Sequence, residues 1–320
     1  MDIKKILAEY YSLEKVGIKK LDGYENENFL VSDSKGKYIL KTYLYREELY
    51  EIVQAERDVL LELKGEERYS LPKPVQTNQG EFEFAYTEDN VEHIVRMLTY
   101  IEGEPFGVTA ATAELYESFG TFLANMDLRL MDIKNKTIEN RKSEWNIVNF
   151  DKNKKLLKYI EDDNDREILN QIFDDFENIV KPAFSSLRFS IIHNDANDFN
   201  VLTKDGEITG LIDFGDLAYA PLIDELAVAI AYAGFGKKNP RKWAEIILKS
   251  YDKIIPLKQN ELDVLFYMIT CRLATTILNA AYSRVVNPEN KYASSSEKDA
   301  WDALNLWINS YSEKKTISFE

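Results

Sequence analysis

Two short stretches in the second half of the chain, IIHNDANDFNVL (residues 191–202) and GLIDFGD (residues 210–216), decide the expected fold. In each, apolar residues typical of a short buried strand stand beside carboxylate and amide side chains. Asp195 and Asn200 share one loop, and Asp213 follows the next strand after a Lys-Asp-Gly turn. These side chains are therefore expected to converge at one end of a hairpin.

The residue types in this loop suit phosphoryl transfer. That reaction needs one group to orient the attacking hydroxyl and oxygen ligands to hold magnesium against the nucleotide phosphates. Asp195 is a carboxylate able to accept the hydroxyl proton. Asn200 and Asp213 carry hard oxygen donors, the ligands that Mg²⁺ prefers.

The same stretches resemble the H-G-D-x4-N and I-D-x-G elements of the aminoglycoside phosphotransferase family. By that resemblance Asp195 is the catalytic base, Asn200 and Asp213 bind Mg²⁺, and ATP or GTP is the co-substrate. Asn194 stands where the family usually has glycine. The resemblance implies an α+β, bilobal, protein-kinase-like fold, with residues 1–100 as the nucleotide-binding lobe and residues 101–320 as the helical catalytic and substrate-binding lobe.

Hydrophobic periodicity predicts the same division of the chain. The first hundred residues show a short helix, a hairpin, a helix over residues 47–63 and two further strands, which together predict a small antiparallel sheet. After Gly103 and Pro105 the pattern is mostly helical. The helices are expected at residues 113–126, 162–184, 222–233, 242–253 and 262–285, and short strands at 189–192, 201–202 and 208–212.

The first half offers an independent test of a kinase. Such an enzyme needs a strand lysine on the phosphates and a helix glutamate to pair with it. Lys41 ends the predicted strand at residues 38–40, and Glu56 lies in the following helix. Glu48 is the alternative partner if the helix is phased differently.

Further nucleotide contacts follow from the resemblance. The turn before Lys41 contains Gly23 and is expected over the phosphates. Residues 95–103 look like the family hinge, where backbone groups near Thr99 and Ile101 would bond the nucleotide base.

Much of the chain also resembles the hydroxylysine-kinase-like branch of the family. That likeness implies a hydroxylated amino acid or an amino alcohol as acceptor, with homoserine and aminoglycosides as other family substrates. Carboxylates would attract an amino group and an indole would cover its aliphatic part, so Asp198, Asp216 and Trp145 are candidate substrate contacts. Each is about as easily explained as structural. His193 is expected to orient the loop by hydrogen bonding.

Composition narrows the classes of partner. The formal net charge of −15 opposes nucleic-acid binding. The single Cys271 excludes a disulfide within the chain and suits a reducing compartment. No secretory signal or membrane-length apolar run is recognised, so a cytoplasmic protein without a membrane partner is expected.

Two other kinds of protein carry related elements. A protein kinase needs a long activation segment after its metal-binding aspartate, whereas Pro221 follows Asp213 by only eight positions. A pseudokinase would bind nucleotide without transferring phosphate. The joint presence of Lys41, Asp195 and both expected magnesium ligands disfavours it, although residue types alone do not prove turnover.

Overall fold

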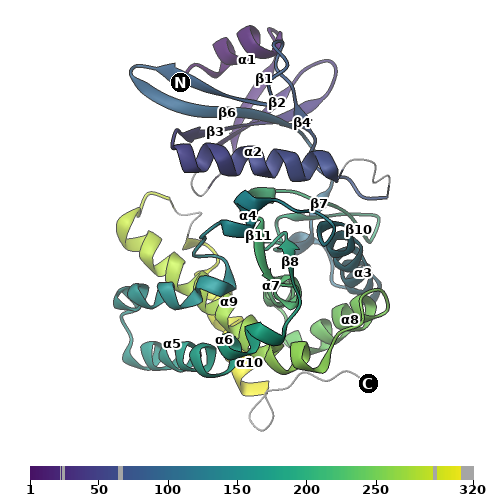
Figure 1. Ribbon diagram of the computed structural model, residues 1–320, viewed down its shortest axis with the longest axis vertical. Coiled ribbons are helices and arrows are strands. Elements are labelled where there is room, and N and C mark those ends of the chain that lie inside the picture. The colour runs from purple at the N-terminus through teal and green to yellow at the C-terminus, as the bar shows by residue number, and fades with distance from the viewer. Residues whose placement is uncertain (22, 24–25, 64–67, 291–293, 311–320) are drawn as a thin grey trace. The chain divides into compact units, whose positions relative to one another are not determined.

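The chain divides into two compact units, Met1–Glu102 and Gly103–Glu320 (Figure 1). The computed structural model describes residues 1–310 except 22, 24–25, 64–67 and 291–293. The predicted α+β class is confirmed, because one unit is built on an antiparallel sheet and the other is mainly helical.

The first unit is an antiparallel sheet with a helix on each face. Its strands follow the order β1-β2-β3-β6-β4, and β5 pairs with β6. Pairing is antiparallel throughout. The elements are α1 (Ile3–Tyr11), β1 (Gly17–Leu21), β2 (Glu27–Ser32), β3 (Lys37–Leu44), α2 (Glu47–Glu62), β4 (Pro74–Val75), β5 (Glu83–Glu88) and β6 (Val91–Thr99).

The alternation of side chains along each strand separates an apolar face from a charged one. Leu40 and Met97 are cross-strand partners and belong to the apolar core that Leu7 of α1 completes. Their strand neighbours Lys41 and Arg96 are also partners, and they project from the opposite face. That face carries α2, because Arg96 forms an ion pair with a residue of that helix. Since β3 runs on to Leu44, Lys41 lies within the strand and does not end it.

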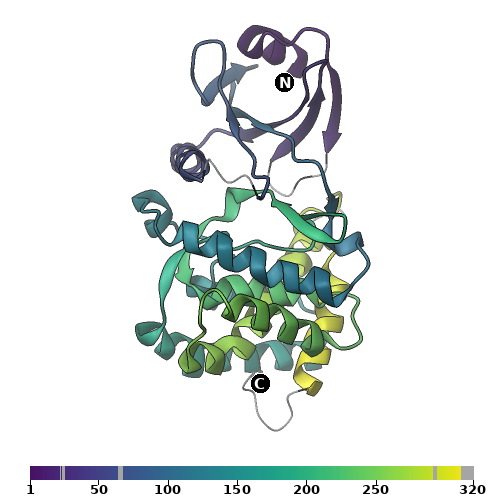
Figure 2. The same ribbon diagram turned by 90° about the vertical axis from the view of Figure 1, so that its right-hand side faces the viewer.

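The second unit is mainly helical and includes several short β-segments (Figures 1 and 2). Its elements are β7 (Glu104–Pro105), η1 (Phe106–Val108), α3 (Ala113–Leu130), α4 (Lys136–Asn140), η2 (Ile147–Tyr159), α5 (Asp163–Asp175), η3 (Phe176–Val180), α6 (Lys181–Ala183), η4 (Phe184–Ser186), β8 (Phe189–Ile192), β9 (Val201–Lys204), β10 (Glu207–Leu211), η5 (Phe214–Asp216), β11 (Ala218–Pro221), α7 (Ile223–Ala233), α8 (Pro240–Asp252), α9 (Gln259–Val286) and α10 (Glu297–Ser310).

Two of these helices form the centre of the second unit. Every residue of α7 is buried, and α9 packs beside it. Among the described residues, α9 is the one helix whose length and composition would allow it to cross a membrane, yet 94% of its most apolar window is buried inside the protein. A helix that is apolar on all sides is typical of a protein core as well.

The β-segments pair differently from a simple reading of the sequence. The hairpin predicted around the Lys-Asp-Gly turn is confirmed, since β9 pairs with β10 and Asp205 and Gly206 both have positive φ. However, β8 pairs with β11, a strand that ends at Pro221 and that the sequence did not indicate. The loop of residues 193–200 therefore connects two separate small sheets.

Several helical segments also differ from the prediction. The helix expected over residues 162–184 is interrupted at Phe176–Val180, where it forms a π-helical turn just before Pro182. A proline removes a backbone donor and disturbs the helix before it. The long 3-10 segment η2 and the helices α4 and α10 were not predicted, although the buried residues of α10 recur at helical spacing.

The burial of α7 predicts a large loss of stability on truncation. Replacing Leu226, which is fully buried, with alanine should lower the free energy of unfolding by about 2 to 5 kcal/mol, because the removed methyl groups leave a cavity. Urea denaturation measures this change. Val286→Ala, at an exposed helix end, is the control and should change it by less than about 0.5 kcal/mol. Equal effects of the two substitutions would contradict the assignment of α7 to the core.

Candidate active site

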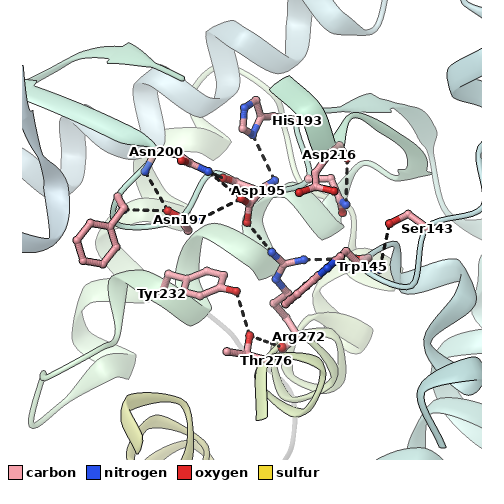
Figure 3. Close-up of polar contacts among 12 residues, drawn as sticks. Ser143, Trp145, His193, Asp195, Asn197, Asn200, Asp216, Tyr232, Arg272 and Thr276 are labelled. Carbon is pink, nitrogen blue, oxygen red and sulfur yellow. Dashed lines mark hydrogen bonds and ion pairs between the residues drawn. The ribbon is translucent and has the colours of Figure 1, made fainter. Parts of the chain in front are cut away.

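The loop between β8 and β9 folds around the carboxylate of Asp195. The Asn200 side-chain amide donates to Asp195 Oδ2 at 2.7 Å and to the Asp195 carbonyl at 2.9 Å. Asn197 donates to the same Oδ2 at 3.0 Å (Figure 3). Because the amide nitrogen of Asn200 donates to Asp195, the orientation of the amide is fixed. Its oxygen is then available as an acceptor.

His193 orients this loop and is neutral. Its Nδ1 accepts from the Asp195 N–H at 3.3 Å, so its Nε2–H donates to the Ile212 carbonyl at 3.1 Å. Burial lowers the pKa of His193 to about 4. The ring therefore joins the loop of residues 193–200 to the end of β10, and its protonation state does not change near neutral pH.

The backbone at Asn194 has a conformation that glycine adopts easily. Its φ is +65°, in the left-handed region that asparagine tolerates better than most residues. Its N–H donates to Glu225 Oε2 at 3.0 Å, and its side-chain amide donates to the Asp216 carbonyl at 3.2 Å. The departure from the glycine of the resembling family is thus accommodated without loss of the turn.

The expected magnesium ligands lie at the same end of the β9–β10 hairpin. Leu211 pairs with Val201, and the Ile212 N–H donates to the Asn200 carbonyl at 2.9 Å. Asp213 follows directly and also has a left-handed backbone, with φ +62°. The structure thus brings Asp195, Asn200 and Asp213 together, as the spacing predicted.

The donor set at this end of the hairpin fits a hard divalent cation that is shared with phosphate. Asn200 offers an amide oxygen and Asp213 a carboxylate oxygen. Mg²⁺ commonly binds such oxygen ligands together with the phosphates of a substrate. Within the described residues, no group of three or more His, Cys, Asp or Glu side chains is arranged to hold a metal ion. A cation here would therefore take its other ligands from nucleotide or water.

Two residues that support these loops were not singled out as site residues from the sequence. Glu225, buried in the first turn of α7, accepts from the catalytic-loop backbone. Arg141 donates to the carbonyls of Gly215 at 2.6 Å and Leu217 at 3.1 Å. Their bonds to backbone atoms far away in the sequence cannot be read from a local pattern.

Arg272 is the unexpected residue of the site. It lies on α9, and its guanidinium is 2.6 Å from Asp195 Oδ1. The side chain is only 4% exposed, whereas that of Asp195 is 17% exposed. The guanidinium carbon lies over the rings of Trp145, at 4.9 Å, and Tyr232, at 5.3 Å (Figure 3). An arginine within an otherwise apolar helix was the available signal in the sequence.

Opposing effects set the protonation of Asp195. Burial raises its pKa to about 8, while Arg272 opposes the rise and Asp216 and Asp213 reinforce it. The Arg272 guanidinium and the Asn197 amide favour the ionised form, which is the form able to accept a proton.

The candidate substrate contacts lie in different surroundings. Arg272 lies between Trp145 and Asp195, because it contacts both residues. The Trp145 carbonyl also accepts a hydrogen bond from Arg272 at 3.3 Å. Asp216 is 35% exposed and lies 3.7 Å from Arg141. Asp198 packs against Gly107, where an added Cβ would lie 2.7 Å from its Oδ2, and burial raises the pKa of Asp198 to about 6.

In the first unit, the buried partner of Glu56 is Arg96. The two side chains form an ion pair at 2.7 Å, and each is 3% exposed. Arg96 is the cross-strand neighbour of Lys41, so Glu56 lies beside the expected phosphate-binding lysine. The predicted Lys41–Glu56 pair stays a prediction. Glu48 is exposed, so the helix is phased with Glu56 inward.

The other expected nucleotide contacts are distributed along the sheet. A Cβ at Gly23 would lie 2.4 Å from the Asn26 carbonyl, so this turn requires glycine. The rest of that turn includes residues 22 and 24–25, which lie outside the described residues. The Thr99 N–H donates to the Lys73 carbonyl at 3.0 Å. A base contact at Thr99 would therefore use its carbonyl, and the contact at Ile101 stays a prediction.

Comparison with known proteins assigns the family. Residues 18–260 match the model of the phosphotransferase enzyme family, called APH. The chain belongs to this family. The predicted resemblance and the predicted enzyme class, a phosphotransferase with an alcohol group as acceptor, are confirmed.

Individual relatives of this phosphotransferase span almost its whole length. It is 28% identical to hydroxylysine kinase of Xenopus laevis over 326 aligned positions, covering 94% of this chain and 87% of that one. It is also 28% identical to hydroxylysine kinase of Mus musculus, covering 90% and 83%.

Solved structures support the fold. An amicoumacin kinase solved with AMP-PNP and Ca²⁺ has a TM-score of 0.72 at 17% identity, covering 100% of this chain and 96% of that one. A microcompartment-associated aminopropanol kinase has a TM-score of 0.69 at 15% identity, covering 96% and 97%.

The Glu56–Arg96 pair predicts a specific loss of stability. Glu56→Gln leaves the buried guanidinium without its counter-charge and should lower the free energy of unfolding by about 3 kcal/mol. Glu48→Gln, on the exposed side of the same helix, is the matched control and should change it by less than about 0.5 kcal/mol. Chemical denaturation of both variants measures the difference, and equal stabilities would contradict a structural role for the pair.

Buried acids near the catalytic loop predict a pH dependence of stability. Burial raises the pKa of Asp224 to about 7, well above its value in the unfolded chain. The folded state therefore binds more protons, and stability falls as pH rises from about 4 to 7. Asp224→Asn should remove this loss and be more stable than the parent by about 2 to 4 kcal/mol at pH 8, but not at pH 4.

Thermal or urea denaturation across this pH range measures the effect. Asp263→Asn, an exposed position on α9, is the control and should follow the parent at every pH. Parallel pH profiles for Asp224→Asn and the parent would show that Asp224 is not the group responsible.

Proposed function

We propose that this phosphotransferase transfers the γ-phosphoryl group of ATP or GTP to a hydroxyl group of an amino alcohol or a hydroxylated amino acid, of the hydroxylysine or homoserine type. The observation that carries the proposal is the convergence of Asp195, Asn200 and Asp213 at one end of the β9–β10 hairpin. The similarity to hydroxylysine kinases over most of the chain supports the class of acceptor.

Asp195 is the catalytic base in this proposal. Its carboxylate accepts the proton of the acceptor hydroxyl as the oxygen attacks the γ-phosphorus and the bond to the nucleoside diphosphate breaks. Asn200 and Asn197 fix the carboxylate by donating to it. His193 holds the backbone on which Asp195 is carried. A fixed base reduces the entropy that must be lost when the acceptor reaches the reactive geometry.

Asn200 and Asp213 would hold Mg²⁺ against the nucleotide phosphates. When bound, the cation would neutralise the negative charge that develops on the phosphate oxygens. The oriented amide of Asn200 supports this assignment, because its nitrogen donates to Asp195 and leaves its oxygen for a metal. Asp213 supplies the carboxylate, and its left-handed backbone is the kind of strained conformation found at functional sites.

Nucleotide binding belongs to the first unit in the proposal. Lys41 contacts the phosphates, and Glu56 keeps that lysine in place together with Arg96. Gly23 allows the β1–β2 turn to approach the phosphates closely, as glycine does in such loops. Thr99 and Ile101 supply backbone groups to the base. A cytoplasmic location accompanies this use of nucleotide and suits a chain whose single cysteine is a buried thiol.

The test combines an acceptor screen with one substitution. Nucleotide consumption should be measured with hydroxylysine, homoserine, ethanolamine, choline and aminoglycosides, and turnover is expected with a hydroxylated amine. Asp195→Asn should lower kcat at least about 100-fold while nucleotide affinity changes little, because it removes the base and not a phosphate contact. Asp205→Asn, in the exposed hairpin turn, is the control and should keep full activity.

Other outcomes identify the competing functions. Nucleotide binding without turnover on the whole panel would indicate a pseudokinase. Phosphate on serine or threonine of added proteins would indicate a protein kinase. Full activity of Asp195→Asn would remove the assigned base.

A further inference from the structure

Arg272 lies over the ring of Trp145, the side chain that was expected to cover the aliphatic part of the acceptor. Its guanidinium lies over the Trp145 and Tyr232 rings. The Tyr232 hydroxyl is fixed by Thr276 at 3.0 Å, so the second ring is held in position. A cation already covering these rings leaves less aromatic face for the ammonium group of an acceptor.

The guanidinium is not saturated by its contacts. It donates to Asp195 Oδ1 at 2.6 Å and to the Trp145 carbonyl at 3.3 Å. The Nε of Arg272 is buried and has no hydrogen-bond partner among the described residues. Because this Nε is sealed from solvent, a further acceptor would bond to the second N–H groups of the two terminal nitrogens, each of which makes one of the bonds above.

The position of Arg272 favours a ligand-binding role over a purely structural one. Arg188 also forms an ion pair with α9, through Glu261, but that pair does not involve the catalytic loop. Arg272 instead contacts the carboxylate that is proposed to receive the acceptor hydroxyl. Any acceptor that reaches Asp195 must therefore lie beside this guanidinium.

Planar guanidinium groups match the geometry of carboxylates. Two parallel N–H···O bonds between them give both affinity and directional specificity. We propose that Arg272 binds the carboxylate of the acceptor, so that the preferred acceptor is a hydroxylated amino acid and not an amino alcohol that lacks this group. The inference rests on the proposed function and narrows its acceptor class.

One guanidinium contacts both partners in this arrangement. Arg272 keeps one N–H on Asp195 and presents others to the acceptor carboxylate. The acceptor hydroxyl would lie at Asp195 and the acceptor carboxylate at the same guanidinium. Because only the width of that guanidinium separates the two positions, a short carbon chain must join the hydroxyl to the carboxylate. An acceptor without a carboxylate leaves the buried donors unpaired, and sites built to bond a polar group strongly reject analogues that lack it.

The first experiment uses the unmodified enzyme and matched pairs of acceptors. Homoserine is compared with homoserinamide and 3-aminopropan-1-ol, and hydroxylysine with its carboxamide and with 1,5-diaminopentan-2-ol. The amides preserve size while removing the negative charge. The amino acid of at least one set should have a kcat/KM about 30-fold or more above its counterparts without a carboxylate, the scale of a lost charge-assisted hydrogen-bond pair.

The second experiment repeats these ratios in two variants. Arg272→Gln should bring the ratio of acid to amide close to one, even where loss of the Asp195 partner lowers kcat with every acceptor. Arg272→Lys should restore part of the preference, because it keeps the charge but not the planar fork. Arg188→Gln breaks the other ion pair to α9 and should keep the parental ratio.

Binding titrations on the same pairs separate this inference from the proposed function. If no acceptor is phosphorylated, the proposed function fails, whereas tighter binding of the acid than the amide, lost in Arg272→Gln, still supports the assignment. Equal kcat/KM and equal affinity within every pair would overturn it. So would a preference that Arg272→Gln leaves unchanged, or the binding of neither member of any pair. If Arg272→Gln does not fold, the ratios measured on the unmodified enzyme decide.

Discussion

The arrangement of the site depends on the bond between the Asn194 N–H and the buried carboxylate of Glu225. This contact ties the catalytic loop to α7, the helix whose every residue is buried. Because the loop backbone is fixed to the core there, the residues on either side of Asn194 have little freedom. His193 is directed to the end of β10 and Asp195 towards α9. The side chains proposed to carry the chemistry are therefore borne on a backbone that is attached to the buried core.

Burial and charge oppose one another throughout this region. Removing carboxyl groups from water raises their pKa values, as at Asp195, Asp224 and Glu225. Arg272 lowers the pKa of each of these three groups. A single buried cation thus allows several acids to be packed closely, and its removal would affect more than the one carboxylate it touches. Such densely coupled groups are typical of functional sites.

The sequence predicted the fold class, the order of most elements and the convergence of Asp195 with Asn200 and Asp213. These follow from local signals: apolar periodicity, a two-residue turn and a short spacing between polar residues. It did not predict the partners of backbone atoms, as with Arg141, or the pairing of β8 with β11. Arg272 was hidden in an apolar helical pattern. Contacts between segments far apart in the chain depend on packing that no local pattern records.

The left-handed backbone at Asn194 has a consequence for how such chains are recognised. What this position requires is a dihedral angle, and glycine is one of several residues that supply it; asparagine and aspartate can do so as well. A search pattern that insists on glycine at the position of Asn194, before Asp195, would therefore overlook chains like this one. A pattern written for the backbone conformation, admitting those short polar residues, would retrieve them.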